Sequence, residues 1–253
     1  MSWKVSGQFR GSDPDAIAYI AAVEEQDNQA LEYGVNVAIN NFVVGCKDDG
    51  IWDAIKSSCI LAGARTLAGA LVPLVGTAPT NFNFVSGDYD RKTGLVGDGS
   101  TKYLNSNRAG NTEALNNQHL SVYVDTAATA TDAYIGLGGD TGIYRNTGLN
   151  AIDVRSRNSA GGAAGSINSI GFMGISRNNA SNFDARVDGN TVIINSASSI
   201  LNPQNTTVFA RESGTSLFAD ARLAFYSIGE ALDLAALDTR VSNLMTAIGA
   251  TIP

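Results

Sequence analysis

Apolar and polar side chains alternate along the middle of this chain. In the clearest stretch, Leu120, Val122 and Val124 alternate with Ser121 and Tyr123. This is the two-residue period of a strand that buries one face. The same period recurs in later segments, at Ile135 and Leu137, Ile152 and Val154, and Leu223 and Phe225.

Turn signals separate these segments. Asp188-Gly189-Asn190 stands between two apolar stretches, and Asp-Gly favours a tight hairpin because both residues tolerate positive φ. Glycine-rich turns follow other segments, for example at 138–140 and 160–165. Short strands joined by such turns predict a mainly β domain, an antiparallel jelly-roll sandwich over residues 70–232.

The preceding part, residues 1–69, has the pattern of a helical module. Asp13 is followed by Pro14, a cap and a proline in the first helical turn. One amphipathic face then comprises Leu31, Val35, Ala38, Ile39 and Phe42. A further apolar face, at Ile51, Ile55 and Cys59, predicts another helix, so that the helical part extends to about residue 64.

The tail, residues 233–253, has the pattern of one more helix. Its apolar residues follow a 3-4 spacing and form a tail seam of Leu234, Leu237, Val241, Leu244 and Ile248. Such a seam is compatible with two structures: a helix packed on the sandwich, or a short self-association seam. The second alternative predicts a homo-oligomer.

Composition narrows the classes of partner. Charged residues make up 16% of the chain, below the usual share of about 25%, while hydrophobic residues make up 44%. A net charge of -7 with no basic run argues against nucleic acid as a partner. The longest apolar run, about residues 67–75, is too short to span a bilayer, so we expect no membrane insertion. The N-terminal residues lack a signal pattern, which predicts synthesis without Sec-type export.

Candidates for metal and redox chemistry are few. Cys46 and Cys59 are expected to be reduced and buried, with a disulfide between them as the open alternative. The single histidine, His119, is distant in sequence from both, so no metal site is expected. Asp88, Asp90 and Asp98 cluster in sequence and form either side-chain-capped turns or a Ca²⁺ site. No other cofactor is expected.

No catalytic pattern emerges from the sequence. Glycosidases need two carboxyl groups in one groove, and the acids between residues 70 and 230 are isolated in sequence. His119 precedes a strand and is expected to be structural. The chain is therefore predicted not to be an enzyme. Four tyrosines are candidates for stacking on sugars, or are sandwich aromatics with hydroxyls at the rim: Tyr89, Tyr103, Tyr134 and Tyr144.

Three segments carry a resemblance to a known fold family. The segment 97–104, Gly-Asp-Gly-Ser-Thr-Lys-Tyr-Leu, resembles the opening strand pair of laminin-G-like, concanavalin A-like domains. The segments 120–124 and 222–232 resemble a core strand and the closing strand of those domains. The resemblance implies a concanavalin A-like jelly roll.

A wider resemblance covers nearly the whole chain. The helical segment 16–61, the sandwich and the tail 234–248 together look like proteins of tailed bacteriophages, such as tail fibres, spikes and head decorations. This implies a virion structural protein made in the host cytoplasm. It also implies a trimer, docking of the helical module on other virion proteins, and contact with host-surface glycan. The alternatives are a free carbohydrate-binding module and a glycan-degrading enzyme.

Overall fold

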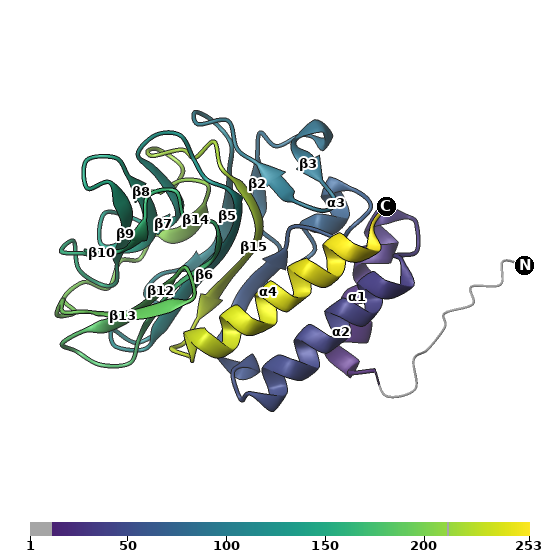
Figure 1. Cartoon of the computed structure of the whole chain (residues 1–253), viewed down its shortest axis with the longest axis horizontal. Helices are drawn as coiled ribbons and strands as arrows, with labels where there is room; N and C mark the ends of the chain where they lie inside the picture. Colours follow the sequence, from purple (N-terminus) through teal and green to yellow (C-terminus); the bar gives the residue numbers. More distant parts are fainter. Residues whose placement is uncertain (1–11, 212) are drawn as a thin grey trace, which may run out of the picture.

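Two antiparallel sheets form a jelly-roll-like sandwich in the computed structural model, which describes residues 12–211 and 213–253 (Figure 1). The first sheet has the order β13 (Asn190–Ile194), β12 (Phe183–Val187), β11 (Gly171–Arg177), β6 (Gln118–Thr126), β15 (Arg222–Gly229), β4 (Gly94–Val96) and β3 (Tyr89–Asp90). The second has the order β10 (Gly162–Ser166), β9 (Ala151–Arg155), β8 (Thr141–Asn146), β7 (Asp132–Leu137), β14 (Asn205–Val208), β5 (Tyr103–Ala109) and β2 (Thr80–Phe82). The mainly β prediction is confirmed.

Helices cover the outer face of the first sheet and make a third layer. These are α1 (Pro14–Asp27), α2 (Tyr33–Asp48) and α4 (Leu234–Thr251), with the short α3 (Leu67–Ala70) and the 3-10 turns η1 (Trp52–Ala54) and η2 (Ser86–Asp88) nearby. Figure 1 shows α4 and α2 side by side along this face. The central strands of the first sheet are therefore buried on both faces, and nearly every residue of β11 and β15 is buried.

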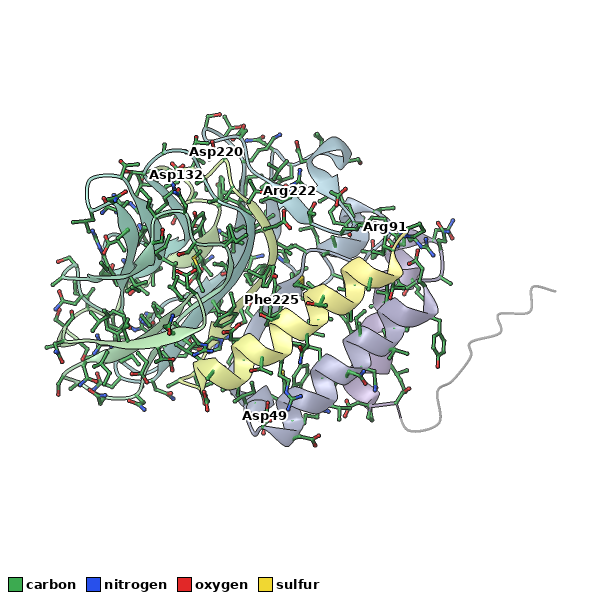
Figure 2. The ribbon with its side chains drawn as sticks, in the orientation of Figure 1. Asp49, Arg91, Asp132, Asp220, Arg222 and Phe225 are labelled. Atoms are coloured by element: carbon green, nitrogen blue, oxygen red, sulfur yellow. The ribbon has the colours of Figure 1, made fainter. Side chains whose placement is uncertain are left out.

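Strand β15 shows this double burial most clearly. Tyr226 and Ile228 belong to the core between the sheets, whereas Phe225 belongs to the core between the first sheet and the helices. The Phe225 ring meets Phe42 of α2 edge to face, with centroids 5.7 Å apart. Figure 2 places Phe225 beside α4. Strand β15 thus contributes side chains to both cores.

The start of the helical part is confirmed. Asp13 caps α1 by accepting a hydrogen bond from the Asp15 amide at 2.9 Å, and Pro14 occupies the first helical turn. The predicted helix around Phe42 is α2.

The helix predicted around Cys59 is wrong. Residues 55–60 form β1 (Ile55–Ile60), which pairs with β15. Its side chains are buried on both faces: Cys59 lies in the core between the sheets, and Ile55 in the core under the helices. A register shift between Ile55 and Ser57 puts Ile55 and Cys59 on opposite faces, and their spacing of four residues resembles that of a helical face. Because β1 belongs to the first sheet, the N-terminal part contributes a strand to the sandwich as well as helices.

The tail seam is buried inside the chain. Leu234, Leu237, Val241, Leu244 and Ile248 are at most 3% exposed and belong to the core shared with α2 and the first sheet. Their burial corrects the self-association hypothesis for this seam and confirms the alternative, a helix packed on the sandwich. The trimer consequently has no support from these five side chains.

Other local predictions can be checked directly. Asp188 and Gly189 have φ values of 53° and 72° in the β12–β13 hairpin, as predicted. Cys46 and Cys59 are free and buried, and burial raises the pKa of each thiol to about 12. Within the described residues, every helix is too short or too polar to cross a membrane.

Candidate functional site

A polar groove lies where the start of α4 meets the outer face of strands β11 to β13. It encloses about 450 Å³, and we call it the α4 groove; its lining comprises Ser176, Asn178, Asp184, Thr191 and residues 231–235. Its size suits one or two sugar-sized groups. It combines carboxylate, amide and hydroxyl side chains with apolar ones from the loop into α4.

The two-residue period of β12 places Asp184 in this groove. Phe183, Ala185 and Val187 are buried between the sheets, so the residues between them face outward. Within the described part of the chain, the carboxylate of Asp184 takes part in no hydrogen bond and no ion pair. The groove thus presents a free acceptor to a ligand.

Two further groups in the groove are partly engaged. Asp233 caps α4, because its Oδ1 accepts hydrogen bonds from the amides of Ala235 at 2.8 Å and Ala236 at 3.2 Å. Asn178 accepts a bond from the Asn179 amide group at 3.0 Å. Among the residues that the structure describes, none accepts a hydrogen bond from the side-chain nitrogen of Asn178, so the groove holds a donor beside its acceptors.

The loop that forms one wall of the groove is held from beneath. The Ser176 hydroxyl donates to the Leu232 carbonyl at 2.8 Å and accepts from the Leu232 amide at 3.0 Å. Asn117 accepts from the Ala231 amide at 2.8 Å. Three hydrogen bonds thereby fix Ala231 and Leu232 of the loop, and the wall keeps its shape without a ligand.

The opposite wall depends on a buried arginine. Arg177 is fully buried, and its guanidinium donates to the carbonyls of Asn179 and Asn182 at 3.2 and 3.0 Å. Burial lowers the pKa of Arg177 to about 10, so the side chain keeps its charge at neutral pH. These bonds shape the loop after β11, which carries Asn178.

His119 is structural, as the sequence suggested. Its ring is fully buried, and burial lowers its pKa to about 4. Nδ1 lies 2.6 Å from the Glu230 carbonyl and Nε2 lies 2.9 Å from the Ser227 hydroxyl. A neutral ring satisfies both contacts, and it supports the same loop into α4.

The tyrosines singled out from the sequence do not line this groove. Tyr134 and Tyr144 are 0% and 3% exposed, which corrects their assignment as sugar-stacking residues. The Tyr144 ring is covered by Arg155 and Arg211, whose guanidinium carbons lie 5.4 and 5.9 Å from its centroid. The alternation of residues along a strand does not predict the burial of these two rings, because residues of loops and neighbouring strands cover them.

Tyr89 and Tyr103 are partly exposed, and their stacking on sugars stays a prediction. The Tyr89 hydroxyl donates to the Ala64 carbonyl at 2.9 Å, and burial raises the pKa of Tyr89. The Tyr103 ring stacks on Phe82 at 4.3 Å and meets Phe218 edge to face. One face of the Tyr103 ring is thus covered by Phe82.

The clustered acids near Asp98 shape turns. Asp98 accepts hydrogen bonds from three successive backbone amides at 2.8–3.0 Å and from the Thr101 hydroxyl at 2.6 Å; these bonds outweigh desolvation and hold its pKa well below the usual range. Asp90 accepts from two amides, and Asp88 pairs with Lys102 at 2.6 Å. Among residues 12–211 and 213–253, no three metal-ligating side chains gather in one place.

The structure also brings together acids that are isolated in sequence. Asp132 and Asp220 lie near each other at one end of the sandwich (Figure 2), and burial together with Asp220 raises the pKa of Asp132. Asp220 accepts hydrogen bonds from the backbone amide and the hydroxyl of Thr129, so it holds the loop between β6 and β7 in place. Asp184 and Asp233 similarly share the α4 groove. Sequence spacing concealed both pairs.

Comparison with known proteins supports the fold. No protein family and no curated protein matches this chain. The binding domain of botulinum neurotoxin serotype D is similar over 76% of this chain and 51% of that chain, with 13% identity and a TM-score of 0.50. A mutant of Trypanosoma rangeli sialidase that displays trans-sialidase activity covers 83% of this chain and 39% of its own, with 10% identity and a TM-score of 0.47. The chain thus spans about half or less of these solved structures.

At this level of identity the similarity defines a class of fold. The chain is an antiparallel β-sandwich with helices over one face. Its function has to be argued from its own side chains.

Proposed function

We propose that this protein binds glycan in the α4 groove. The observation that carries the proposal is the unpaired carboxylate of Asp184, placed beside the amide of Asn178 and the partly exposed side chain of Leu232. Sugar hydroxyls donate to carboxylates and accept from amides, and the C–H faces of a sugar ring pack on apolar side chains. The lectin-like sandwich supports the proposal as a scaffold for such a site.

The first experiment is a glycan array probed with the full chain, followed by titration of the glycans that it retains. Asp184→Asn removes the charge and one acceptor of the groove. Asp125→Asn is the matched control, because within the described residues the Asp125 carboxylate accepts a hydrogen bond only from the adjacent Thr126 hydroxyl, and Asp125 is not among the residues that line the groove. We expect Asp184→Asn to weaken binding about tenfold or more and Asp125→Asn to change it less than about twofold. Equal effects of the two variants, or retention of no glycan, would overturn the proposal.

We propose binding without turnover. A glycosidase needs one carboxyl group that donates a proton and a second that acts as nucleophile or base. In the α4 groove, Asp233 is committed to capping α4 through its Oδ1. Chromatography of a bound glycan after prolonged incubation should show it intact; a product that disappears in Asp184→Asn would establish an enzyme instead.

The setting that we propose is a tailed-phage virion, as a tail fibre, spike or head decoration that displays the sandwich towards host-surface glycan. Its support is the resemblance of the helices, sandwich and tail taken together. A second groove, of about 470 Å³, runs between α2 and α4 and includes Asn41, Asp48 and Asn243, and it offers a docking face to another virion protein. Mass spectrometry of purified particles tests the setting, and a chain missing from mature particles would contradict it.

A further inference from the structure

The charges around the α4 groove are unevenly distributed. Asp184 and Asp233 line it, and its described lining residues include no lysine or arginine. The nearest cation on the same strand, Arg186, donates to Asp238 at 2.7 Å and to the Thr191 hydroxyl at 3.1 Å. Asp238 therefore neutralises the positive charge at this edge of the groove. A ligand that enters the groove meets uncompensated negative charge.

The start of α4 would ordinarily favour an anion. Free amides and the helix dipole make a helix N-terminus attractive to carboxylates and phosphates. Here the carboxylate of Asp233 already accepts from the amides of Ala235 and Ala236. The position that an acidic sugar could occupy at this helix is thus filled by the protein's own carboxylate.

We infer that the α4 groove selects glycans by charge: it accepts neutral sugars, prefers sugars that carry an ammonium group, and rejects sugars that carry a carboxylate or sulfate. This inference rests on the proposed function. The Asp184 carboxylate accepts hydrogen bonds from hydroxyl groups and makes stronger, charge-assisted bonds with an ammonium. A sugar carboxylate in the same place adds a like charge to two others, and the net charge of -7 opposes its approach.

The test uses matched glycans on one array, probed with the full chain at about pH 6, where a sugar amine carries its proton. Each neutral glycan stands beside its sialylated and sulfated forms, and N-acetylglucosamine oligomers stand beside their deacetylated forms. We expect every acidic form to bind about tenfold more weakly than its neutral parent. The deacetylated oligomers should bind at least about threefold more tightly than the acetylated ones.

Two comparisons tie the selection to the groove. Asp184→Asn should reduce the difference between neutral and acidic forms to less than about threefold, while Asp125→Asn preserves it. Raising the salt concentration from about 0.05 M to about 0.5 M should narrow the difference in the wild-type chain. An acidic glycan bound as tightly as its neutral parent would overturn the inference and leave glycan binding intact. Retention of no glycan would overturn the proposed function itself.

Discussion

The Nδ1 atom of His119 lies 2.6 Å from the carbonyl oxygen of Glu230. A carbonyl can only accept, so Nδ1 carries the hydrogen, and Nε2 accepts a hydrogen bond from the Ser227 hydroxyl. A neutral imidazole in the centre of the first sheet thereby anchors the loop that begins α4 and forms a wall of the groove. The sole histidine of the chain links the integrity of the sandwich to the shape of the candidate site.

This anchor predicts a pH-dependent stability. The pKa of His119 is about 4 in the folded chain, below the usual 6.5, so the unfolded chain binds more protons between these values. Neutral His119 therefore stabilises the folded chain fully above about pH 6.5, and this stabilisation is lost as the pH falls towards 4. The loss in the free energy of unfolding amounts to at most about 3 kcal/mol. Denaturant unfolding at pH 7, 6 and 5 measures it.

The control for this prediction is His119→Asn, whose amide nitrogen can still donate to Glu230 but does not titrate. Its free energy of unfolding should change little between about pH 6.5 and 5, the interval above most carboxyl pKa values. A wild-type chain equally stable at pH 7 and 5 would contradict the role assigned to His119.

Phe225 should be among the costliest residues to truncate. It is fully buried between β15 and the helices and meets Phe42 edge to face. Phe225→Ala should lower the free energy of unfolding by about 3–5 kcal/mol, because it leaves a cavity between the sheet and helix layers. Phe225→Leu, which fills more of that space, should cost clearly less. Similar midpoints for all three chains in urea would show that the helices do not depend on this contact.

The alternation of apolar and polar residues predicts a strand correctly where one face of the strand is buried and the other carries polar side chains. The prediction failed for β1, because a register shift between Ile55 and Ser57 allows Ile55 and Cys59 to be buried on opposite faces of the sheet. A four-residue spacing then looks helical. Whether a helix such as α4 packs within its own chain or on a second copy depends on tertiary contacts that the 3-4 spacing does not encode.

Burial of the tail seam leads to a prediction about concentration. Leu237 is fully buried against the same chain, so Leu237→Ala should cost about 2–5 kcal/mol of stability. The exposed Leu149→Ala should cost less than about 0.5 kcal/mol. For wild type and both variants, the melting temperature should not vary with protein concentration. A melting temperature that rises with concentration, and does so less in Leu237→Ala, would restore the seam as a contact between copies.

Asp98 is predicted to stabilise its turn through hydrogen bonds. Asp98→Ala leaves three backbone amides and the Thr101 hydroxyl without this acceptor and should cost about 1 kcal/mol at pH 7, more than Asp125→Ala. Because the folded pKa of Asp98 is lowered, this stabilisation is present above about pH 4 and declines in more acidic solution. Thermal melts across pH measure the difference.

The same hydrogen bonds bear on calcium. The carboxylate oxygens of Asp98 already accept bonds from the turn, so millimolar Ca²⁺ should leave the melting temperature of the chain unchanged. A rise with Ca²⁺ that Asp98→Ala abolishes would instead make this turn a calcium site.

The candidate site was harder to foresee than the fold. In the sequence, Asp184 is one of the isolated acids between residues 70 and 230, although its place between Phe183 and Ala185 is that of an outward-facing residue of a strand. Nothing in the sequence indicates that the start of α4 lies beside β12, because that contact arises from the packing of the tail on the first sheet.

The most direct test locates the bound glycan by NMR. The changes in the backbone amide chemical shifts of the full chain are measured while a glycan retained on the array is added. The account predicts shifts concentrated at Asn178, Asp184 and residues 231–235, and their loss in Asp184→Asn. Shifts concentrated instead around Tyr103 on the second sheet, and unchanged by Asp184→Asn, would contradict it.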